Sequence, residues 1–384
     1  MRVLHFCRSF SPLSETFVYD YIIGLERHGV ENHVVAYDRQ NADSRPFARV
    51  ETIDGSLRWN PRRLGARLLA VLGLPVPGEL TWPAVRRRLR RVAPRIAPDV
   101  VHAHFGPEGV MIAPVAAALG LPLVVTFYGF DVSQLARLAY WQTHYDRLWP
   151  ATAAITVLSL DMKRQALRLG CPEEKLHVIH LGRNGHSVPP RAGVRSPVRR
   201  LVTVGRLIEK KGHLDAVEAF GRLAAEYPDL RLEIVGEGDL RPRLERRIQE
   251  LGLGDRILLR GALSNDRALA AMAESDGFLL CSRTGSDGDQ EGTPTVLVEA
   301  QMIGLPCVAT VHAGIPELIP PENRTLLAPE GDVDGIARCV QHLLTRDEAE
   351  LQRIVDTGRR HVSAQFDLAQ ETRKLMELYG VCAG

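Results

Sequence analysis

The chain has 384 residues, of which 45% are hydrophobic and 24% are charged, and its formal net charge is +2. This length favours two domains, and this composition is typical of an ordinary globular protein. The small net charge argues against a protein that binds nucleic acid through its overall charge.

The cysteines and the N-terminus place the chain in a reducing compartment. The six cysteines are scattered and contain no C-x-x-C pair, which argues against a zinc site or a disulfide framework. The start "MRVLHFCRSFSP" reads as one short strand and a polar turn, and its apolar run is too short for a signal peptide. No window approaches 18 apolar residues, so we expect no membrane-spanning helix.

The first half of the chain alternates short apolar strands with helices. "RVLHFC" predicts a buried strand, and "SETFVYDYIIGLERHG" predicts a helix with Ser14 as N-cap and Gly29 near its C-terminus. Further strands are expected at "HVVAYD", "DVVHAHF", "LPLVVTFYG", "ATAAITVLS" and "KLHVIHLG". Continuous apolar strands between helices indicate a parallel, doubly wound sheet.

The pattern then starts again. Residues 183–200, "RNGHSVPPRAGVRSPVRR", read as a linker because they are rich in Pro, Gly and Arg and lack periodicity. A second series follows with strands at "RLVTVGRL", "LRLEIVGEG", "RILLRG", "DGFLLCS", "PCVAT" and "RTLLAP", and residues 333–379 read as helices.

We therefore predict two Rossmann-like domains that face each other across a cleft, with ligands bound outside the carboxyl ends of the strands. The expected boundaries are residues 1–185 for the first domain, 186–200 for the linker and 201–365 for the second domain. A C-terminal helix, residues 366–384, is expected to pack back on the first domain.

The stretch "DGDQEGTPTVLVEAQMIGLPCVAT" places two carboxylates, Glu291 and Glu299, around the start of an apolar helix. Eight helical residues span roughly 12 Å. That is longer than the about 5 to 9.5 Å between paired glycosidase carboxylates. The spacing suits a long ligand with hydroxyls at both ends and a pyrophosphate at the helix N-terminus, as in a nucleotide-diphosphate sugar. In the alternative, Glu291 caps the helix and Glu299 is a solvated helix residue.

Two loops after strands add weaker signals. In "VGRLIEKKG", Arg206 and Lys211 could neutralise a diphosphate leaving group, although such loop cations are usually only solvated. In "VGEGD", Gly236 to Asp239 read as a tight turn where backbone could meet a flat base, or as a plain turn. It is not a dinucleotide fingerprint.

Together, "VGRLIEKKG", "IVGEGDLRPRLE", "LRGALSNDRALAAMAESD", "GDQEGTPTVLVEAQMIGLPCVAT" and "HAGIPELI" resemble the retaining, nucleotide-sugar-dependent glycosyltransferases of family 4, which have the GT-B fold. "SPLSETFVYDYI", "VVHAHFG" and "VIHLG" are similar to the branch that builds colanic acid and other exopolysaccharides. The resemblance covers nearly the whole chain and is more specific in the C-terminal half.

The resemblance implies a role for each matching residue. It implies that Arg206 and Lys211 hold the diphosphate, that Glu291 contacts the donor sugar and that Glu299 binds the ribose. The remaining substrate contacts that it implies are Gly292, Thr293, Pro294 and Thr295 at the sugar and phosphates, Gly236 and Glu237 near the base, and Ser14, Glu15 and Thr16 lining the cleft.

One position departs from the family. The family usually carries a histidine before the glycine of "TFYGFD", where this chain has Tyr128, with Gly129 and Asp131 retained. A tyrosine can donate a hydrogen bond but cannot carry positive charge near neutral pH. We expect an altered donor preference, with a slower or inactive enzyme as the alternatives. His102 and His104 are more simply interpreted as strand-end residues with satisfied hydrogen bonds.

The resemblance implies retention by front-face attack, in which the cations replace a metal ion and no cofactor is needed. The departing phosphate would be stabilised by Arg206, Lys211 and the helix dipole. The donor is expected to be a UDP- or GDP-sugar. Two rival functions are a GT-B sugar-nucleotide epimerase and a catalytically silent binding protein.

Residues 56–98 carry ten arginines against one glutamate, together with Trp59 and Trp82. Such a segment could lie on an anionic membrane surface and meet a lipid-linked acceptor, or it could be a solvated helix pair. The sequence thus predicts a cytoplasmic enzyme that makes exopolysaccharide or other cell-surface glycan, possible contact with the inner face of the membrane, and no nucleic-acid partner.

Overall fold

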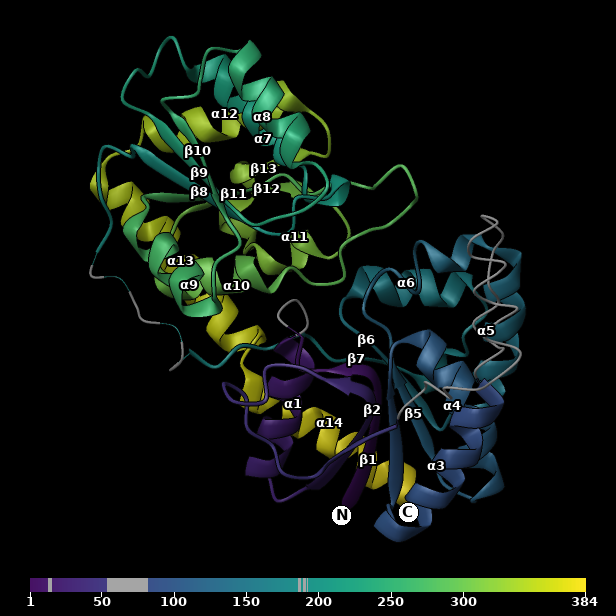
Figure 1. The fold of residues 1–384 in the computed structure, drawn as a ribbon. Coiled ribbons are helices and arrows are strands. Elements are labelled where there is room, and N and C mark those ends of the chain that lie inside the picture. The colour runs from purple at the N-terminus through teal and green to yellow at the C-terminus, as the bar shows by residue number, and fades with distance from the viewer. Residues whose placement is uncertain (13–15, 54–81, 186–187, 189–190, 192) are drawn as a thin grey trace. The chain divides into compact units, whose positions relative to one another are not determined.

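The computed structural model describes the chain except residues 13–15, 54–81, 186–187, 189–190 and 192 (Figure 1). The chain divides into two compact units. The first unit comprises Met1–Val157, Gln165–Ile179 and Thr372–Gly384, and the second comprises Leu158–Arg164 and His180–Glu371. Within the described residues, no helix combines the length and apolar character that are needed to cross a membrane.

The first unit contains a seven-stranded sheet in the order β3-β2-β1-β4-β5-β6-β7, in which every pairing is parallel. Its strands are β1 (Arg2–Phe10), β2 (Glu31–Arg39), β3 (Val50–Thr52), β4 (Val100–His104), β5 (Leu123–Thr126), β6 (Ala154–Val157) and β7 (Leu176–Val178). The sequence had not indicated the short edge strand β3, whose residues are partly or fully exposed.

Helices cover the first sheet on both faces (Figure 1). The helices in this part of the chain are α1 (Thr16–Arg27), α3 (Trp82–Ile96), α4 (Gly106–Ala118), α5 (Ala139–Ala151) and the short 3-10 turns η2 (Leu135–Arg137) and η3 (Glu173–Lys175). The helix α6 (Leu160–Arg168) is shared, because its residues up to Arg164 belong to the second unit. Gly29 follows α1 with a φ of +81°, a left-handed conformation that suits a helix C-terminus.

The last helix, α14 (Leu368–Ala383), enters the first unit at Thr372 and packs beside α1. A Cβ atom on Gly24 of α1 would lie 2.6 Å from the Thr372 methyl group, so the two helices approach closely because Gly24 has no side chain. The expectation that a C-terminal helix returns to the first domain is therefore confirmed.

The second unit contains a six-stranded sheet in the order β10-β9-β8-β11-β12-β13, again with parallel pairings. Its strands are β8 (Arg200–Val204), β9 (Arg231–Val235), β10 (Ile257–Gly261), β11 (Gly277–Leu280), β12 (Cys307–Val311) and β13 (Leu327–Pro329). Its helices are η5 (Glu209–Lys211), α7 (His213–Leu223), α8 (Arg241–Glu250), α9 (Asn265–Glu274), α10 (Thr295–Ile303), α11 (Ile315–Leu318), η6 (Pro321–Leu326), α12 (Val333–Leu344) and α13 (Glu348–Gln365).

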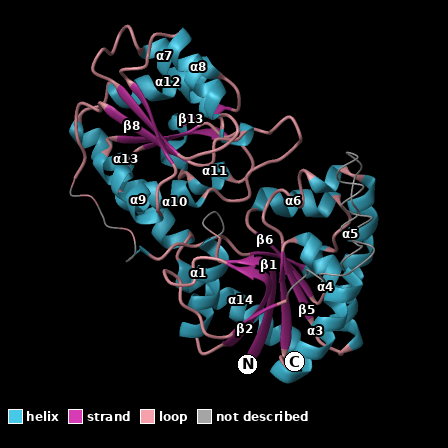
Figure 2. Cartoon of the chain, in the orientation of Figure 1, coloured by secondary structure: helices cyan, strands magenta, loops and turns pink. Residues whose placement is uncertain are grey.

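The second sheet is buried on both faces, as Figure 2 shows by the helices on either side of its strands. Phe278 and Leu280 of β11 pack into the hydrophobic cluster with α9, α10 and α13. Leu279 between them packs into the opposite cluster with α7, α8 and α12. Burial on both faces explains why these strands read as continuous apolar runs, and the prediction of two parallel, doubly wound sheets is confirmed.

Candidate functional site

Two glycine turns bring the backbone at the carboxyl ends of β8 and β9 into contact. Gly236 has a φ of +147°, and a Cβ atom there would lie 1.9 Å from the carbonyl oxygen of Gly205. Gly238 has a φ of +156°, and a Cβ atom there would lie 2.6 Å from the carbonyl oxygen of Leu207. Only glycine allows this approach, so "VGEGD" is a packing element that shapes the turn carrying Arg206.

The neighbouring Glu237 is exposed and forms an ion pair of 2.6 Å with Arg241, one helical turn further on. Its carboxylate therefore lies on the surface beside the turn. The contact of Gly236 and Glu237 with a nucleotide base stays a prediction.

Lys211 and Glu291 form a buried ion pair. Nζ of Lys211 lies 2.7 Å from Oε1 of Glu291, and 14% and 6% of the two side chains are exposed. The hydroxyl of Ser282 donates to the same oxygen at 3.1 Å. Burial opposes ionisation of Glu291, but the charges of Lys211 and Lys210 and the hydrogen bond from Lys211 outweigh it and lower the pKa to about 2. Glu291 is therefore a carboxylate at neutral pH and accepts hydrogen bonds.

Glu291 lies in the loop before α10 and not on the helix itself. The helix begins at Thr295, its N-cap is Pro294, and no side chain caps it. The capping alternative for Glu291 is therefore wrong. The separation of roughly 12 Å between Glu291 and Glu299 also assumed helical rise throughout, which applies only from Thr295 onward.

The short turn η5 holds the loop that carries Glu291. Nζ of Lys210 lies 2.9 Å from Asp289 and donates to the carbonyl of Gln290 at 3.1 Å. Glu209 accepts hydrogen bonds from the amide and the hydroxyl of Ser286 at 2.9 and 2.6 Å. The sequence analysis missed the role of Lys210, although its place beside Lys211 in "EKK" was a usable signal.

Glu299 is buried in the middle of α10 and is not the solvated residue of the alternative interpretation. Its Oε1 lies 2.8 Å from Nη2 of Arg183, and the same guanidinium nitrogen donates to Oγ1 of Thr295 at 3.1 Å. Arg183 belongs to the segment predicted as a linker, and its part in the site was missed. Binding of a ribose by Glu299 stays a prediction.

The backbone between Glu291 and the helix is also buried at Gly292, Thr293 and Pro294. The Thr293 hydroxyl donates to the carbonyl of Leu158 at 3.0 Å, which ties this segment to the rest of the second unit. A helix N-terminus such as that of α10, a helix of nine residues, attracts phosphate groups through its N–H groups and dipole. Contacts of residues 292–295 with sugar and phosphates stay predictions.

Arg206 is exposed, and its guanidinium forms no ion pair with any residue that the structure describes. Its backbone is held by the imidazole of His213, whose Nε2 lies 3.2 Å from the carbonyl of Arg206. Burial and the charge of Lys211 lower the pKa of His213 to about 4, so this imidazole is neutral at pH 7 and donates from Nε2. The turn is thus fixed while its arginine stays available to a ligand.

A further residue escaped the sequence analysis. The backbone amide of Glu291 donates to Nε2 of the buried His312 at 3.2 Å. His312 follows β12, the strand next to β11. The signal was its place directly before "AGIPEL".

In the first unit, Thr16 is the first residue of α1, whereas Ser14 and Glu15 lie outside the described residues. Asp131 is fully buried and accepts hydrogen bonds from the amides of Tyr128 and Gly129, each at 2.9 Å, and from that of Gly106 at 3.1 Å. Burial raises its pKa to about 6 despite these bonds. Asp131 thus orders the loops after β4 and β5, and contact with substrate would require it to give up these bonds.

Tyr128, at the carboxyl end of β5, turns its hydroxyl toward the sheet. Its oxygen lies 2.6 Å from Nδ1 of His104. Its ring stacks on Phe17 at 4.7 Å and contacts Phe105 at 4.4 Å between centroids. Burial raises the pKa of Tyr128 well above its usual value, so the hydroxyl keeps its proton.

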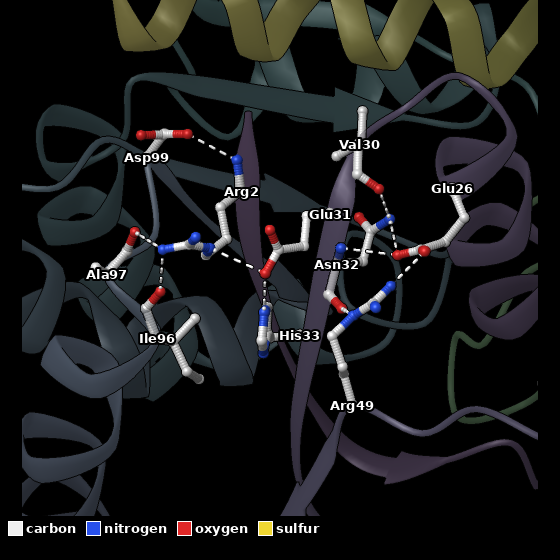
Figure 3. Close-up of polar contacts among 10 residues, drawn as sticks. All are labelled: Arg2, Glu26, Val30, Glu31, Asn32, His33, Arg49, Ile96, Ala97 and Asp99. Carbon is white, nitrogen blue, oxygen red and sulfur yellow. Dashed lines mark hydrogen bonds and ion pairs between the residues drawn. The ribbon is translucent and has the colours of Figure 1, made fainter.

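The direction of this hydrogen bond follows from Asn32 at the other end of a buried chain. Nδ2 of Asn32 donates to Glu26 and to the carbonyl of Val30, each at 2.9 Å (Figure 3). Its Oδ1 therefore faces His5, 2.9 Å from Nε2. Nε2 of His5 must then donate to Asn32, and Nδ1 of His5 accepts from Nε2 of His104 at 3.1 Å. Nδ1 of His104 is left as an acceptor, so the Tyr128 hydroxyl donates to it.

His5, His102 and His104 are the one group of three potential metal ligands found among the described residues, and all three are buried. His102 contacts the hydroxyls of Tyr379 and Thr126 at 2.5 and 2.7 Å. All six ring nitrogens of the three histidines therefore have hydrogen-bond partners. The interpretation of His102 and His104 as satisfied strand-end residues accounts for the cluster without a metal ion.

Both halves of the chain match glycosyltransferase family models. The model described as a glycosyl transferase 4-like domain matches residues 14–182, and the model for glycosyl transferases group 1 matches residues 190–361. WcaL of Escherichia coli K12, assigned to colanic acid biosynthesis, is 30% identical over 98% of this chain and 99% of its own length. AmsK of Erwinia amylovora, an amylovoran biosynthesis glycosyltransferase, shows the same identity and coverage.

Solved glycosyltransferase structures share the fold. HepE from Anabaena in complex with UDP-glucose has a TM-score of 0.76 and 17% identity, covering 99% of this chain and 100% of that one. A glycosyltransferase from Rickettsia africae has a TM-score of 0.77 and 18% identity, covering 99% and 98%. The chain therefore belongs to the family 4 glycosyltransferases of GT-B fold, together with the colanic acid and amylovoran biosynthesis enzymes.

Proposed function

We propose that the protein transfers a sugar from a nucleotide-diphosphate donor, a UDP- or GDP-sugar, to a glycan or lipid-linked acceptor, with retention of configuration and without a metal ion. The product would be an exopolysaccharide or another cell-surface polysaccharide. The names of WcaL, for colanic acid, and AmsK, for amylovoran, support a role in polysaccharide biosynthesis. The complexes of HepE with UDP and UDP-glucose support a nucleotide-sugar donor.

The buried Lys211–Glu291 pair carries the proposal. Lys211 has three N–H donors, and its contact with Glu291 leaves others to meet phosphate oxygens. Glu291 is ionised and offers acceptors to sugar hydroxyls. The exposed guanidinium of Arg206 and the N-terminus of α10 add positive charge in the same unit.

These groups suit stabilisation of a departing diphosphate. Charge that develops on the leaving phosphate would be met by Lys211, Arg206 and the helix end, which are already in place before the reaction. The acceptor's hydroxyl oxygen would attack the anomeric carbon from the face that the diphosphate leaves. The departing phosphate oxygen would take the proton of that hydroxyl. With a pKa of about 2, Glu291 is no acid for this step, so its role is to orient the sugar.

Two measurements separate this function from its rivals. A thermal-shift panel of UDP-, GDP-, ADP- and dTDP-sugars should show one donor that stabilises the protein by about 2.7 kcal/mol at 100 times its Kd. Incubation with donor and acceptor extract should then release nucleoside diphosphate, in the presence of EDTA as well as without it. Binding without release would indicate a silent binding protein, and a changed sugar without transfer would indicate an epimerase.

We also propose a cytoplasmic location with contact to the inner face of the membrane through α3. The described part of the arginine-rich segment forms this helix, which buries Val85, Leu89 and Val92. Its opposite side exposes four arginines that form no ion pair with the described residues, Arg87, Arg88, Arg90 and Arg91, while the exposed Arg95 pairs with Glu51. Cosedimentation with anionic vesicles, lost when these four are replaced by glutamine and absent with neutral vesicles, would support the contact. Equal binding of the variant would remove α3 from it.

A further inference from the structure

His312 sits between a carboxylate and the backbone of Glu291. It is 3% exposed and follows β12, while Glu330 follows β13, the next strand of the sheet. Nε2 of His312 lies 3.2 Å from the amide nitrogen of Glu291, and Nδ1 contacts Oε2 of Glu330. Because a backbone amide only donates, Nε2 must be unprotonated and Nδ1 must carry the proton.

The two ends of this arrangement are themselves held. Glu330 accepts hydrogen bonds from the amide and the hydroxyl of Thr284, each at 3.2 Å. The amide of His312 donates to the carbonyl of Thr310 at 2.9 Å, and its carbonyl accepts from Ile315 at 2.9 Å. The imidazole is thus fixed in both place and tautomer.

We propose that His312 is a positioning residue for transfer: its Nε2 sets the backbone at Glu291, so that this carboxylate meets Lys211 and the donor sugar together. The proposal rests on the function proposed above. Loss of the contact should lower kcat, because Glu291 contacts the sugar that is transferred. It should change the donor KM less, because the nucleotide part of the donor makes most of the binding contacts.

Two substitutions separate the two contacts of the ring. In His312→Gln the amide group reaches the place of Nε2 and can accept from Glu291. In His312→Asn the shorter amide reaches only the place of Nδ1, beside Glu330. We expect His312→Asn to lower kcat by about 10- to 100-fold, the range for small misplacements at a reacting centre. His312→Gln should recover most of that loss, with the donor KM within about twofold in both.

His361→Asn is the matched control, since His361 bonds to the carbonyl of Glu317 on a different part of the second unit. It should keep the wild-type rate. Equal losses in the Gln and Asn variants, with both folded, would overturn the role of the Nε2 contact, and so would wild-type rates in both. Wild-type transfer by Glu291→Gln would instead overturn the proposed function of the site.

A second measurement does not depend on activity. Imidazole nitrogen spectra of the full chain labelled with ¹⁵N-histidine should show a neutral Nδ1–H tautomer whose signal is absent from His312→Gln. The Nδ1–H signal of His180, which donates to the carbonyl of Leu158 at 3.0 Å, should remain in this variant. A His312 that is protonated on Nε2 would contradict the proposal whatever the enzyme's activity.

Discussion

The hydroxyl of Tyr128 donates a hydrogen bond to Nδ1 of His104, 2.6 Å away, and so turns into the sheet. At this position the family usually has a histidine. The chain replaces it with a ring that stacks on Phe17 while its polar end is occupied elsewhere. Replacing the family's histidine by Tyr128 therefore does more than remove a group that can be positively charged. The hydrogen-bonding hydroxyl of Tyr128 also points into the protein.

Tyr128→Phe should destabilise the first unit. The substitution leaves Nδ1 of the buried His104 without a donor, which costs about 1–3 kcal/mol. The free energy of unfolding from urea titration should fall by that amount, and a stability within 0.5 kcal/mol of wild type would show that the contact is not formed.

Tyr128→His should change the choice of donor sugar. A histidine ring is too short to keep both the Phe17 stack and the His104 contact, so its nitrogens can turn toward a ligand. The same panel of sugar nucleotides should rank differently for this variant by thermal shift and turnover. An unchanged ranking would show that residue 128 does not set donor preference.

Stability should fall as the pH drops from about 6.5 to 4. Burial lowers the pKa of His5 to about 4 and those of His102 and His104 well below 6.5, so the unfolded chain binds protons in this range before the folded chain does. His5 alone accounts for at most roughly 3 kcal/mol. Asp131 and Asp215 act in the opposite direction, because their raised pKa values favour the folded state as the pH falls. They are opposed by the three histidines and by His213, whose pKa is also lowered to about 4.

The check is the urea midpoint measured from pH 7.5 to 4.5. His5→Gln should have a lower midpoint at pH 7.5 but a shallower decline toward acid, since one titrating group is gone. An identical pH slope in this variant would show that His5 titrates normally.

The sequence could predict that Lys211 and Glu291 lie close together, because they follow strands that are neighbours in the sheet. Lys211 comes after β8 and Glu291 after β11, and these strands are adjacent in the sheet, so their loops meet at the same edge. Apolar runs located the strands, and the parallel order then placed a cation and a carboxylate from distant parts of the chain together.

The hydrogen-bond and ion-pair partners of individual residues could not be predicted, because they depend on the directions in which single side chains point. Arg183 lies in a stretch without periodicity, yet it is the partner of Glu299. The direction of the Tyr128 hydroxyl depends on Asn32, on another strand, through two histidines whose tautomers are fixed only by the complete chain of contacts. No local pattern carries that information.

Glu291 and Lys211 should be coupled in stability as well as in activity. Glu291→Ala should abolish transfer and also destabilise the fold, since the change leaves Lys211 buried without its partner. Breaking a buried pair costs about 3–5 kcal/mol.

Glu291→Gln, Lys211→Met and the double variant form the test. The double variant should be less destabilised than the sum of the single ones, with a coupling of about 0.5–3 kcal/mol by urea unfolding, and all three should lack transfer. Additive losses would show that the two side chains do not interact.

Gly236→Ala should weaken both the fold of the second unit and its affinity for nucleotide. The new Cβ atom would lie 1.9 Å from the carbonyl oxygen of Gly205, and the φ of +147° is strained for alanine, so the turns after β8 and β9 must separate. The conformational strain alone costs of order 1–3 kcal/mol, and the clash adds to it.

Gly254→Ala is the matched control, because a Cβ atom there meets nothing within 4 Å. The urea midpoint and the thermal shift with the preferred nucleotide should both fall for Gly236→Ala and stay near wild type for Gly254→Ala. A folded Gly236→Ala protein with unchanged nucleotide affinity would show that the contact between the two turns does not shape the donor site.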